Sequence, residues 1–215
     1  MLFVWYKVSF DEKWSHGSAV CETVYFFVEF VCVFPWKCVS LNNQNRGKIM
    51  DGILRKLPIG IQTFEKLREG DFLYVDKTAL VWRIASTETP YFLSRPRRFG
   101  KSLLLSTFEA YFEGKKELFE GLAIADMEKE WKTYPLFHLD LNAEKYDSPQ
   151  ALVEILSRQL TQWELKYGKG EDEETLSGRF AGVIRRACEQ SGRGVVVLVD
   201  EYDKPLLQAL GDDAL

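Results

Sequence analysis

The sequence predicts an α/β fold in which a mostly parallel sheet lies between helices. Short apolar runs alternate with amphipathic segments from residue 50 onward, and the run at 195–199 is apolar without interruption. A strand that is apolar on both faces is typical of a parallel sheet that helices cover on both sides. The chain has 215 residues, of which 46% are hydrophobic and 28% charged. This is the length and composition of one ordinary globular domain.

Charge and cysteine usage narrow the class of protein. The formal net charge of -4 gives no overall basic field that would attract nucleic acid or anionic lipid. The cysteines form no C-x-x-C pair, which indicates free or buried thiols in a reducing cytoplasm rather than a zinc site. The most apolar stretch, residues 24–34, is interrupted by Glu29 and is shorter than the about 20 residues of a membrane helix. We therefore expect a cytoplasmic protein without a membrane segment or signal peptide.

Composition divides the chain near Met50. Residues 1–49 are rich in Trp, Val, Phe and Cys, and the polar stretch 41–48 is typical of a linker. One interpretation is a small β-rich module, because residues 22–34 have the composition of a strand. The other is an atypical N-terminal extension, not native to the domain, with Met50 as the natural start. The sharp change at a methionine favours the second interpretation and a domain over 50–215.

Helix and strand signals follow in order after Met50. Ile61, Phe64 and Leu67 recur three apart, which predicts a helix over 60–69. Ser148 as N-cap and Pro149 at the first helical position begin a predicted helix that stops at Gly168. The other expected elements are a strand or turn at 72–78, helices at 78–86, 101–114 and 173–192, and strands at 90–94, 136–142 and 194–200.

The stretch "SRPRRFGKSLL" (94–104) has the order strand, turn and helix that a phosphate-binding loop requires. Its end matches the pattern G-x-x-x-x-G-K-[ST], while Arg95 stands at the opening glycine position. Gly100 would let the backbone approach phosphates, Lys101 would reach the β- and γ-phosphates, and Ser102 would bind Mg²⁺. The alternative is a basic surface turn before an ordinary helix. The candidate nucleotide-binding residues are Arg95, Pro96, Arg97, Arg98, Phe99, Gly100, Lys101, Ser102 and Leu103.

A second motif decides between these alternatives. "VVVLVDEYDKP" (195–205) is an aliphatic strand ending in acids, as in a Walker B motif. Asp200 would hold Mg²⁺ through water, and Glu201 would act as the catalytic base beside the catalytic Lys101. Alone, the motif could be a strand that ends in a solvated acidic turn. Together, the two motifs favour ATP and Mg²⁺ as cofactors, with Ser102 and Asp200 as the metal site.

These motifs carry a family resemblance. "LPIGIQTFEKLREGDFLYVDKTALV", "YFLSRPRRFGKSLLLSTFEAYFEG" and "VVVLVDEYDKPLL" resemble the bacterial predicted AAA-ATPase-like family of P-loop NTPases over roughly 57–210. The resemblance implies that Arg95 is the family's ordinary residue at this position. It also places Asp76, Lys77 and Thr78 in a motif near the nucleotide, whereas the residues alone equally suggest a capped helix start. In this family a PD-(D/E)XK nuclease-like domain commonly follows the ATPase.

The resemblance further implies a three-layer sandwich with strand order 5-1-4-3-2, in which one strand separates the phosphate-loop strand from the Walker B strand. The fourth and fifth strands would follow residue 215, so we expect a C-terminally truncated ATPase domain with a gap in mid-sheet and open edges. Such a fragment should hydrolyse ATP poorly. Two other functions stay open: a nucleic-acid-binding protein that uses the arginine-rich loop, which the acidic total disfavours, and a non-catalytic interaction module.

Overall fold

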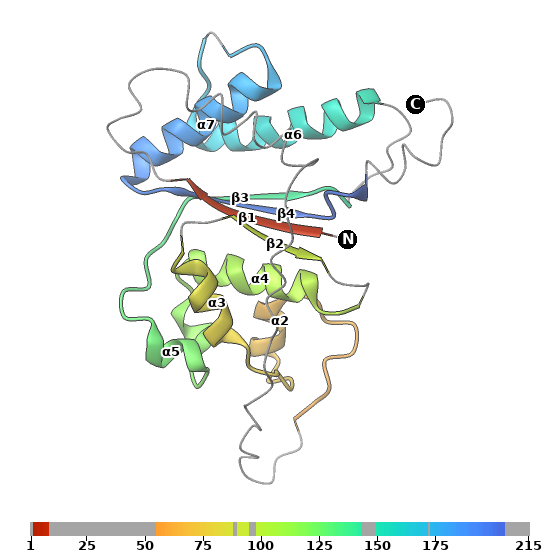
Figure 1. The fold of residues 1–215 in the computed structure, drawn as a ribbon, viewed down its shortest axis with the longest axis vertical. Helices are drawn as coiled ribbons and strands as arrows, with labels where there is room; N and C mark the ends of the chain where they lie inside the picture. The colour runs from red at the N-terminus through yellow and green to blue at the C-terminus, as the bar shows by residue number, and fades with distance from the viewer. Residues whose placement is uncertain are drawn as a thin grey trace.

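The computed structural model describes residues 55–87, 90–94, 98–142, 149–171 and 173–204, together with the backbone strand at 2–8. It has an α/β fold with one sheet between two layers of helices (Figure 1). Helices α2 to α5 cover one face of the sheet, and α6 and α7 cover the other (Figure 1). The strand expected within 22–34 and the expected N-cap Ser148 lie outside the described residues.

The observed elements follow the predicted order, with shifted boundaries. The helix expected over 60–69 begins at Phe64, because Thr63 before it is extended (φ -104°, ψ 125°). Residues 72–78 form no strand, and Phe72 makes only an isolated bridge with Lys56. The elements are β1 (Leu2–Val8), α2 (Phe64–Glu69), α3 (Thr78–Ala85), β2 (Tyr91–Ser94), α4 (Lys101–Phe112), the 3₁₀ helix η2 (Lys116–Phe119), α5 (Ala123–Met127), β3 (Leu136–Asp140), α6 (Pro149–Tyr167), α7 (Leu176–Ser191) and β4 (Val195–Asp200).

The strand order in the sheet is β2-β1-β4-β3. β3 and β4 are parallel, in register from Leu136 opposite Val196 to Asp140 opposite Asp200. β1 is antiparallel to both of its neighbours, so β2, β3 and β4 all run in one direction and β1 alone is reversed. The sheet therefore differs from the mostly parallel pairing that the sequence predicted, and the difference lies in this one strand.

β1 occupies the position where we expected a gap. It lies between the strand of the phosphate loop and the acidic strand, and the structure corrects the expectation of an open mid-sheet edge. The physical reason is that β2 and β4 otherwise expose facing rows of backbone N–H and C=O groups, which any extended segment can satisfy. The register sets Leu2 opposite Ser94 and Phe3 opposite Asp200, so the ends of β2 and β4 share one edge of the sheet.

β4 is the centre of the core, as its apolar run predicted. All of its residues are buried. Val196 and Leu198 pack in the core with α2 to α5, whereas Val195, Val197 and Val199 pack in the core with α6 and α7. Because side chains alternate along a strand, Asp200 projects toward the α4 side of the sheet. Within the described part of the chain, no helix is long and apolar enough to cross a membrane.

Candidate functional site

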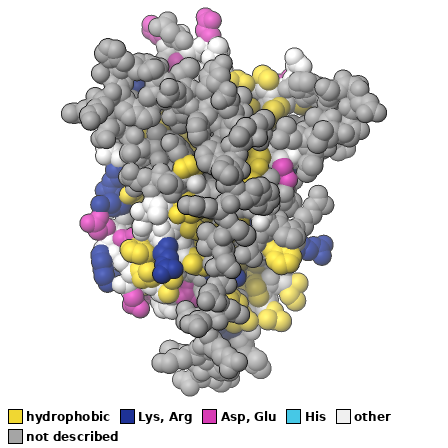
Figure 2. Space-filling model, in the orientation of Figure 1, with side chains coloured by type: hydrophobic (Ala, Val, Ile, Leu, Met, Phe, Trp, Pro, Cys, Tyr) yellow, Lys and Arg dark blue, Asp and Glu magenta, His cyan; other side chains and the backbone are white. Residues whose placement is uncertain are grey.

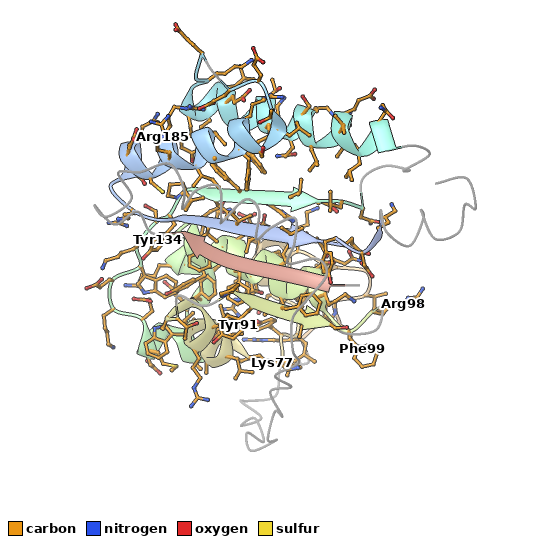
Figure 3. All side chains as sticks on the ribbon, turned by 45° about the horizontal axis from the view of Figure 1, so that its top comes forward. Lys77, Tyr91, Arg98, Phe99, Tyr134 and Arg185 are labelled. Atoms are coloured by element: carbon orange, nitrogen blue, oxygen red, sulfur yellow. The ribbon has the colours of Figure 1, made fainter. Side chains whose placement is uncertain are left out.

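The candidate site lies where β2 and β4 end and α4 begins. The loop between β2 and α4 includes Arg95, Pro96 and Arg97, which lie outside the described residues. Arg98 and Phe99 follow them and lie beyond the tip of β2, at the edge of the molecule (Figure 3). Phe99 is 63% exposed. These two side chains therefore flank the loop without packing into the core.

Gly100 gives the loop the backbone shape that precedes α4. It is the N-cap of the helix in the left-handed conformation (φ 76°), and Arg98 is left-handed as well (φ 66°). Glycine reaches this region without strain, whereas other residues reach it rarely. As the N-cap residue, Gly100 has no side chain that could cap the first turn of α4. The N–H groups of that turn and the positive end of the helix dipole are therefore directed to the place where an anion would bind.

The first residues of α4 bring the two sequence motifs together. Lys101 is 6% exposed although it carries a charge. The Ser102 hydroxyl donates a hydrogen bond to Asp200 Oδ2 over 3.3 Å. Leu103 is half-buried and packs against the core on this side of the sheet. The end of the phosphate-loop motif and the end of the acidic strand thus form one site.

Glu201 lies directly beyond β4 in an unusual backbone conformation. Its φ of 57° is in the left-handed region, which costs free energy for a residue with a side chain. The residue is 8% exposed. The turn that follows is held by Lys204, whose Nζ donates to the backbone oxygen of Asn142 over 2.7 Å. Strained, buried carboxylates of this kind concentrate at functional sites.

The carboxyl groups of the site carry more negative charge than their surroundings stabilise. Burial raises the pKa of Asp200, and the nearby charge of Asp140 raises it further, whereas His138 and the Ser102 hydrogen bond act in the opposite direction. Burial also raises the pKa of Glu201, together with the charges of Asp200 and Asp203, and Lys101 partly offsets them. A cation bound here would relieve this repulsion.

The donor atoms fit a hard divalent cation that keeps most of its water. Asp200 and Ser102 supply a carboxylate and a hydroxyl oxygen, the ligand type that Mg²⁺ prefers. Among the described residues, no group of three or more His, Cys, Asp or Glu side chains could hold a metal ion by itself. This matches the usual Mg²⁺ sites of nucleotide enzymes, where one or two protein ligands act together with substrate phosphates.

Asp76 and Thr78 have a structural role in this fold. Asp76 Oδ1 accepts hydrogen bonds from the backbone N–H and the hydroxyl of Thr78, which starts α3. Asp76 Oδ2 accepts from the N–H of Ala123, and the Thr78 hydroxyl accepts from the N–H of Ile124. The pair thus caps α3 and ties it to α5. This arrangement supports the capped helix start, while Lys77 between them is exposed (Figure 3).

Sequence reasoning missed three polar residues beside the site. Glu109 on α4 contacts His138 on β3, and Asp140 ends β3 next to Asp200. The signal for His138 and Asp140 was the alternation of "LFHLDLN", which sets both on the face opposite to Phe137 and Leu139. No sequence signal identified Glu109 as their partner, because that contact depends on how α4 is rotated over the sheet.

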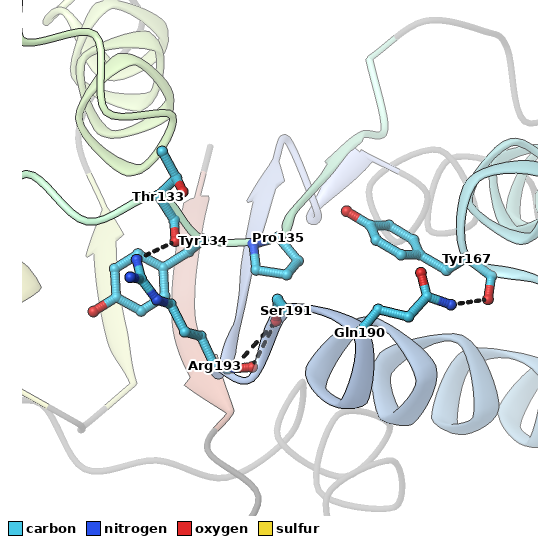
Figure 4. Close-up of a pocket in the computed structure, with 7 residues that line it drawn as sticks. All are labelled: Thr133, Tyr134, Pro135, Tyr167, Gln190, Ser191 and Arg193. Carbon is cyan, nitrogen blue, oxygen red and sulfur yellow. Dashed lines mark hydrogen bonds between the residues drawn. The ribbon is translucent and has the colours of Figure 1, made fainter.

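A hollow lies at the end of β3 and β4 that is opposite to the candidate site. It has a volume of about 420 Å³ (Figure 4). Arg193 Nη1 donates to the backbone oxygen of Thr133, and Gln190 Nε2 donates to that of Tyr167. These side chains are engaged in internal contacts, and none of the predicted site residues lines the hollow. The lining residues are Thr133, Tyr134, Pro135, Tyr167, Gln190, Ser191 and Arg193.

Figure 2 shows how the charged side chains of the described residues are distributed over one face of the molecule. On the face shown in Figure 2, Lys and Arg side chains of the described residues lie scattered among acidic and apolar side chains. A nucleic-acid-binding face usually gathers basic side chains in one patch or stripe.

Comparison with known proteins assigns the chain to a family. Residues 58–215 match the family described as predicted AAA-ATPase, and the chain belongs to that family. It is also 43% identical over 157 residues to an uncharacterized protein encoded in the vnfD 5' region of Azotobacter chroococcum mcd 1. That match covers 73% of this chain and 30% of the relative, so the chain spans under a third of the relative's length. No solved structure matches the chain.

Proposed function

We propose that the chain is a P-loop ATP-binding domain that binds ATP with Mg²⁺ at the start of α4. The contact between Ser102 and Asp200 carries the proposal, because it joins a G-K-S loop end to an acidic strand end 98 residues further along the chain. A buried lysine and a buried glutamate lie in the same site. A basic surface turn followed by an ordinary helix would not require the lysine or the glutamate to be buried.

Each candidate residue has a role that its position supports. The N–H groups in the first turn of α4 and the Gly100 backbone would bind the phosphates, and Lys101 would neutralise their charge. Ser102 and Asp200 would hold Mg²⁺, which would supply charge neutralisation for the phosphates. Residues 95–99 would form the rest of the loop, and Leu103 anchors the helix start in the core.

Hydrolysis is proposed separately, for the whole protein of this family. Glu201 would accept a proton from the attacking water, the role of a general base in phosphoryl transfer. Its raised pKa arises from burial first and from neighbouring acids second. A cation in the site would favour its ionised form, so the base would become competent when metal and nucleotide are bound.

Phosphate release measured with the full-length protein and its Glu201→Gln variant tests the hydrolytic part. Glutamine keeps the size of the side chain and removes the base, so the variant should retain ATP binding while turnover falls at least about 100-fold. A variant that turns over at the wild-type rate contradicts the assigned base. ATP binding without phosphate release by the full-length wild type would leave the binding proposal and overturn the hydrolytic part.

A further inference from the structure

A second polar contact joins α4 to the sheet, about two helical turns beyond Ser102. His138 Nδ1 on β3 and Glu109 Oε1 on α4 are 2.6 Å apart. Their side chains are 31% and 28% exposed, so the pair is largely shielded from water. Salt bridges with this degree of shielding are directional and resist screening better than surface pairs.

Helix and strand geometry places the two contacts in one line. Ser102 and Glu109 are about seven residues apart, which puts them on the same face of α4. Because Phe137 and Leu139 pack against α6 and α7, His138 projects to the α4 side of β3. The helix is therefore attached to β4 near its start and to β3 near its middle.

The imidazole of His138 lies among acids from every element that packs around it. Burial by itself would lower the pKa of His138, but its hydrogen bond with Glu109 and the charges of Glu109, Asp140 and Asp200 raise it above the ordinary value. These acids belong to α4, β3 and β4 respectively. Its Nε2 atom is buried and has no hydrogen-bond partner among the described residues. The surrounding acids therefore favour the protonated form of the ring.

Much of the remaining packing of α4 on this side of the sheet is apolar, although Ser106 accepts a hydrogen bond from the N–H of Phe64 on α2, and the backbone oxygen of Phe112 accepts one from the N–H of Tyr134. Leu105, Phe108 and Phe112 are each 2% exposed or less, and they pack in the same cluster as Val196 and Leu198. Apolar packing is non-directional, so it holds the helix against the sheet without strongly fixing its position along the strands. Directional contacts supply that position, and two of them, Ser102–Asp200 and Glu109–His138, join side chains of α4 to side chains of β4 and β3.

We propose that Glu109 and His138 are positioning residues for the nucleotide site. Their contact fixes where α4 lies along β3 and β4, and it thereby holds the start of the helix opposite the end of β4. The inference rests on the proposed function, because the effect of this contact would be measured in the binding of nucleotide together with metal. Ser102 and Asp200 must both lie next to the same cation to hold it. The N–H groups of the loop, in contrast, can bind phosphates in the absence of the cation. Loss of the pair should therefore weaken the Mg²⁺-dependent part of nucleotide affinity and spare the rest.

The test is the ratio of ATP dissociation constants in EDTA and in Mg²⁺, measured by titration with a fluorescent ATP analogue. Glu109→Ala should lower this ratio about 10-fold, the lower end of the loss seen when groups that orient metal ligands are removed. Glu109→Gln, which keeps an acceptor for the His138 N–H, should lower the ratio less and should preserve the fold. His138→Asn places an amide N–H near the position of Nδ1 and should retain more of the ratio than His138→Ala.

Glu65→Ala is the matched control. Glu65 pairs with Lys115 at 3.1 Å, with side chains 43% and 34% exposed, and it ties α2 to the residues just after α4. Its loss should leave the ratio unchanged. An unchanged ratio in Glu109→Ala, or an equal fall in Glu65→Ala, overturns the positioning role. A wild-type chain whose ATP affinity does not depend on Mg²⁺ overturns the proposed function, and the inference with it.

Discussion

Replacing Asp200 by asparagine should stabilise the metal-free chain while removing its Mg²⁺-dependent nucleotide binding. Asp200 is 9% exposed, and burial and the charge of Asp140 raise its pKa. A carboxyl whose pKa is raised in the folded state favours folding when protonated and disfavours it as pH rises through that pKa. Asparagine mimics the protonated form and keeps an oxygen that can accept the Ser102 hydrogen bond.

The size of the gain follows from the strand register. Asp140 and Asp200 are partners on neighbouring strands, and such strands lie about 4.8 Å apart. Two unit charges at that distance repel by about 3 kcal/mol at an effective dielectric constant of about 20. Because Asp140 is exposed, solvent screening reduces the repulsion, and we expect a gain of about 1 kcal/mol in the free energy of unfolding.

Urea unfolding in EDTA, at neutral pH and again near pH 4, measures this gain. The difference in the free energy of unfolding between Asp200→Asn and wild type should be present at neutral pH, and it should shrink toward acid pH as the wild-type carboxyl takes up a proton. Asp140→Asn should give a gain of the same sign, and the double variant should gain less than the sum because the two groups share one repulsion. An Asp200→Asn protein that is no more stable than wild type at neutral pH refutes the reasoning.

Three further predictions concern the fold. A chain that starts at Met50 lacks β1, and it should unfold at a lower urea concentration and self-associate in light scattering, because β2 and β4 then have unpaired edges. Glu164→Gln breaks a buried pair with Arg179 (6% and 12% exposed) and should cost about 3 kcal/mol in urea unfolding. The hydrogen bond with Arg179 lowers the pKa of Glu164 below the ordinary glutamate pKa of 4.5. The loss of stability caused by the substitution should therefore become smaller as pH falls below 4.5. Thr78→Val leaves the buried N–H of Ile124 without its acceptor, which should cost about 1–2 kcal/mol in the same assay.

The sequence predicted the parts of the fold that depend on local pattern. The uninterrupted apolar run of β4 predicted its burial, and the order strand, turn and helix placed Gly100 at the start of α4. Because strands that run in one direction end at one edge of a sheet, the pattern also predicted that the start of α4 would lie near Asp200. The structure brings these residues together as that reasoning required.

The remaining features depend on long-range packing that no local pattern contains. β1 pairs with the backbone groups of β2 and β4 that are otherwise unpaired. Both strands are remote from β1 in sequence, so no local pattern predicted that β1 joins the sheet. The rotation of α4 is decided by the packing of Phe108 and Phe112 under the sheet, and this rotation brings Glu109 to His138. Asp76 and Thr78 reach α5 only after that layer has assembled.

The central claim is that one site at the start of α4 binds nucleotide together with Mg²⁺. The most direct test is an equilibrium titration of the wild-type chain and Lys101→Ala with a fluorescent ATP analogue, each in Mg²⁺ and in EDTA. We predict saturable binding by the wild type, tighter in Mg²⁺ than in EDTA, and a loss of at least about 10-fold in affinity when the buried lysine is removed. Equal affinity of the two proteins, or wild-type binding that is indifferent to Mg²⁺, would contradict the claim.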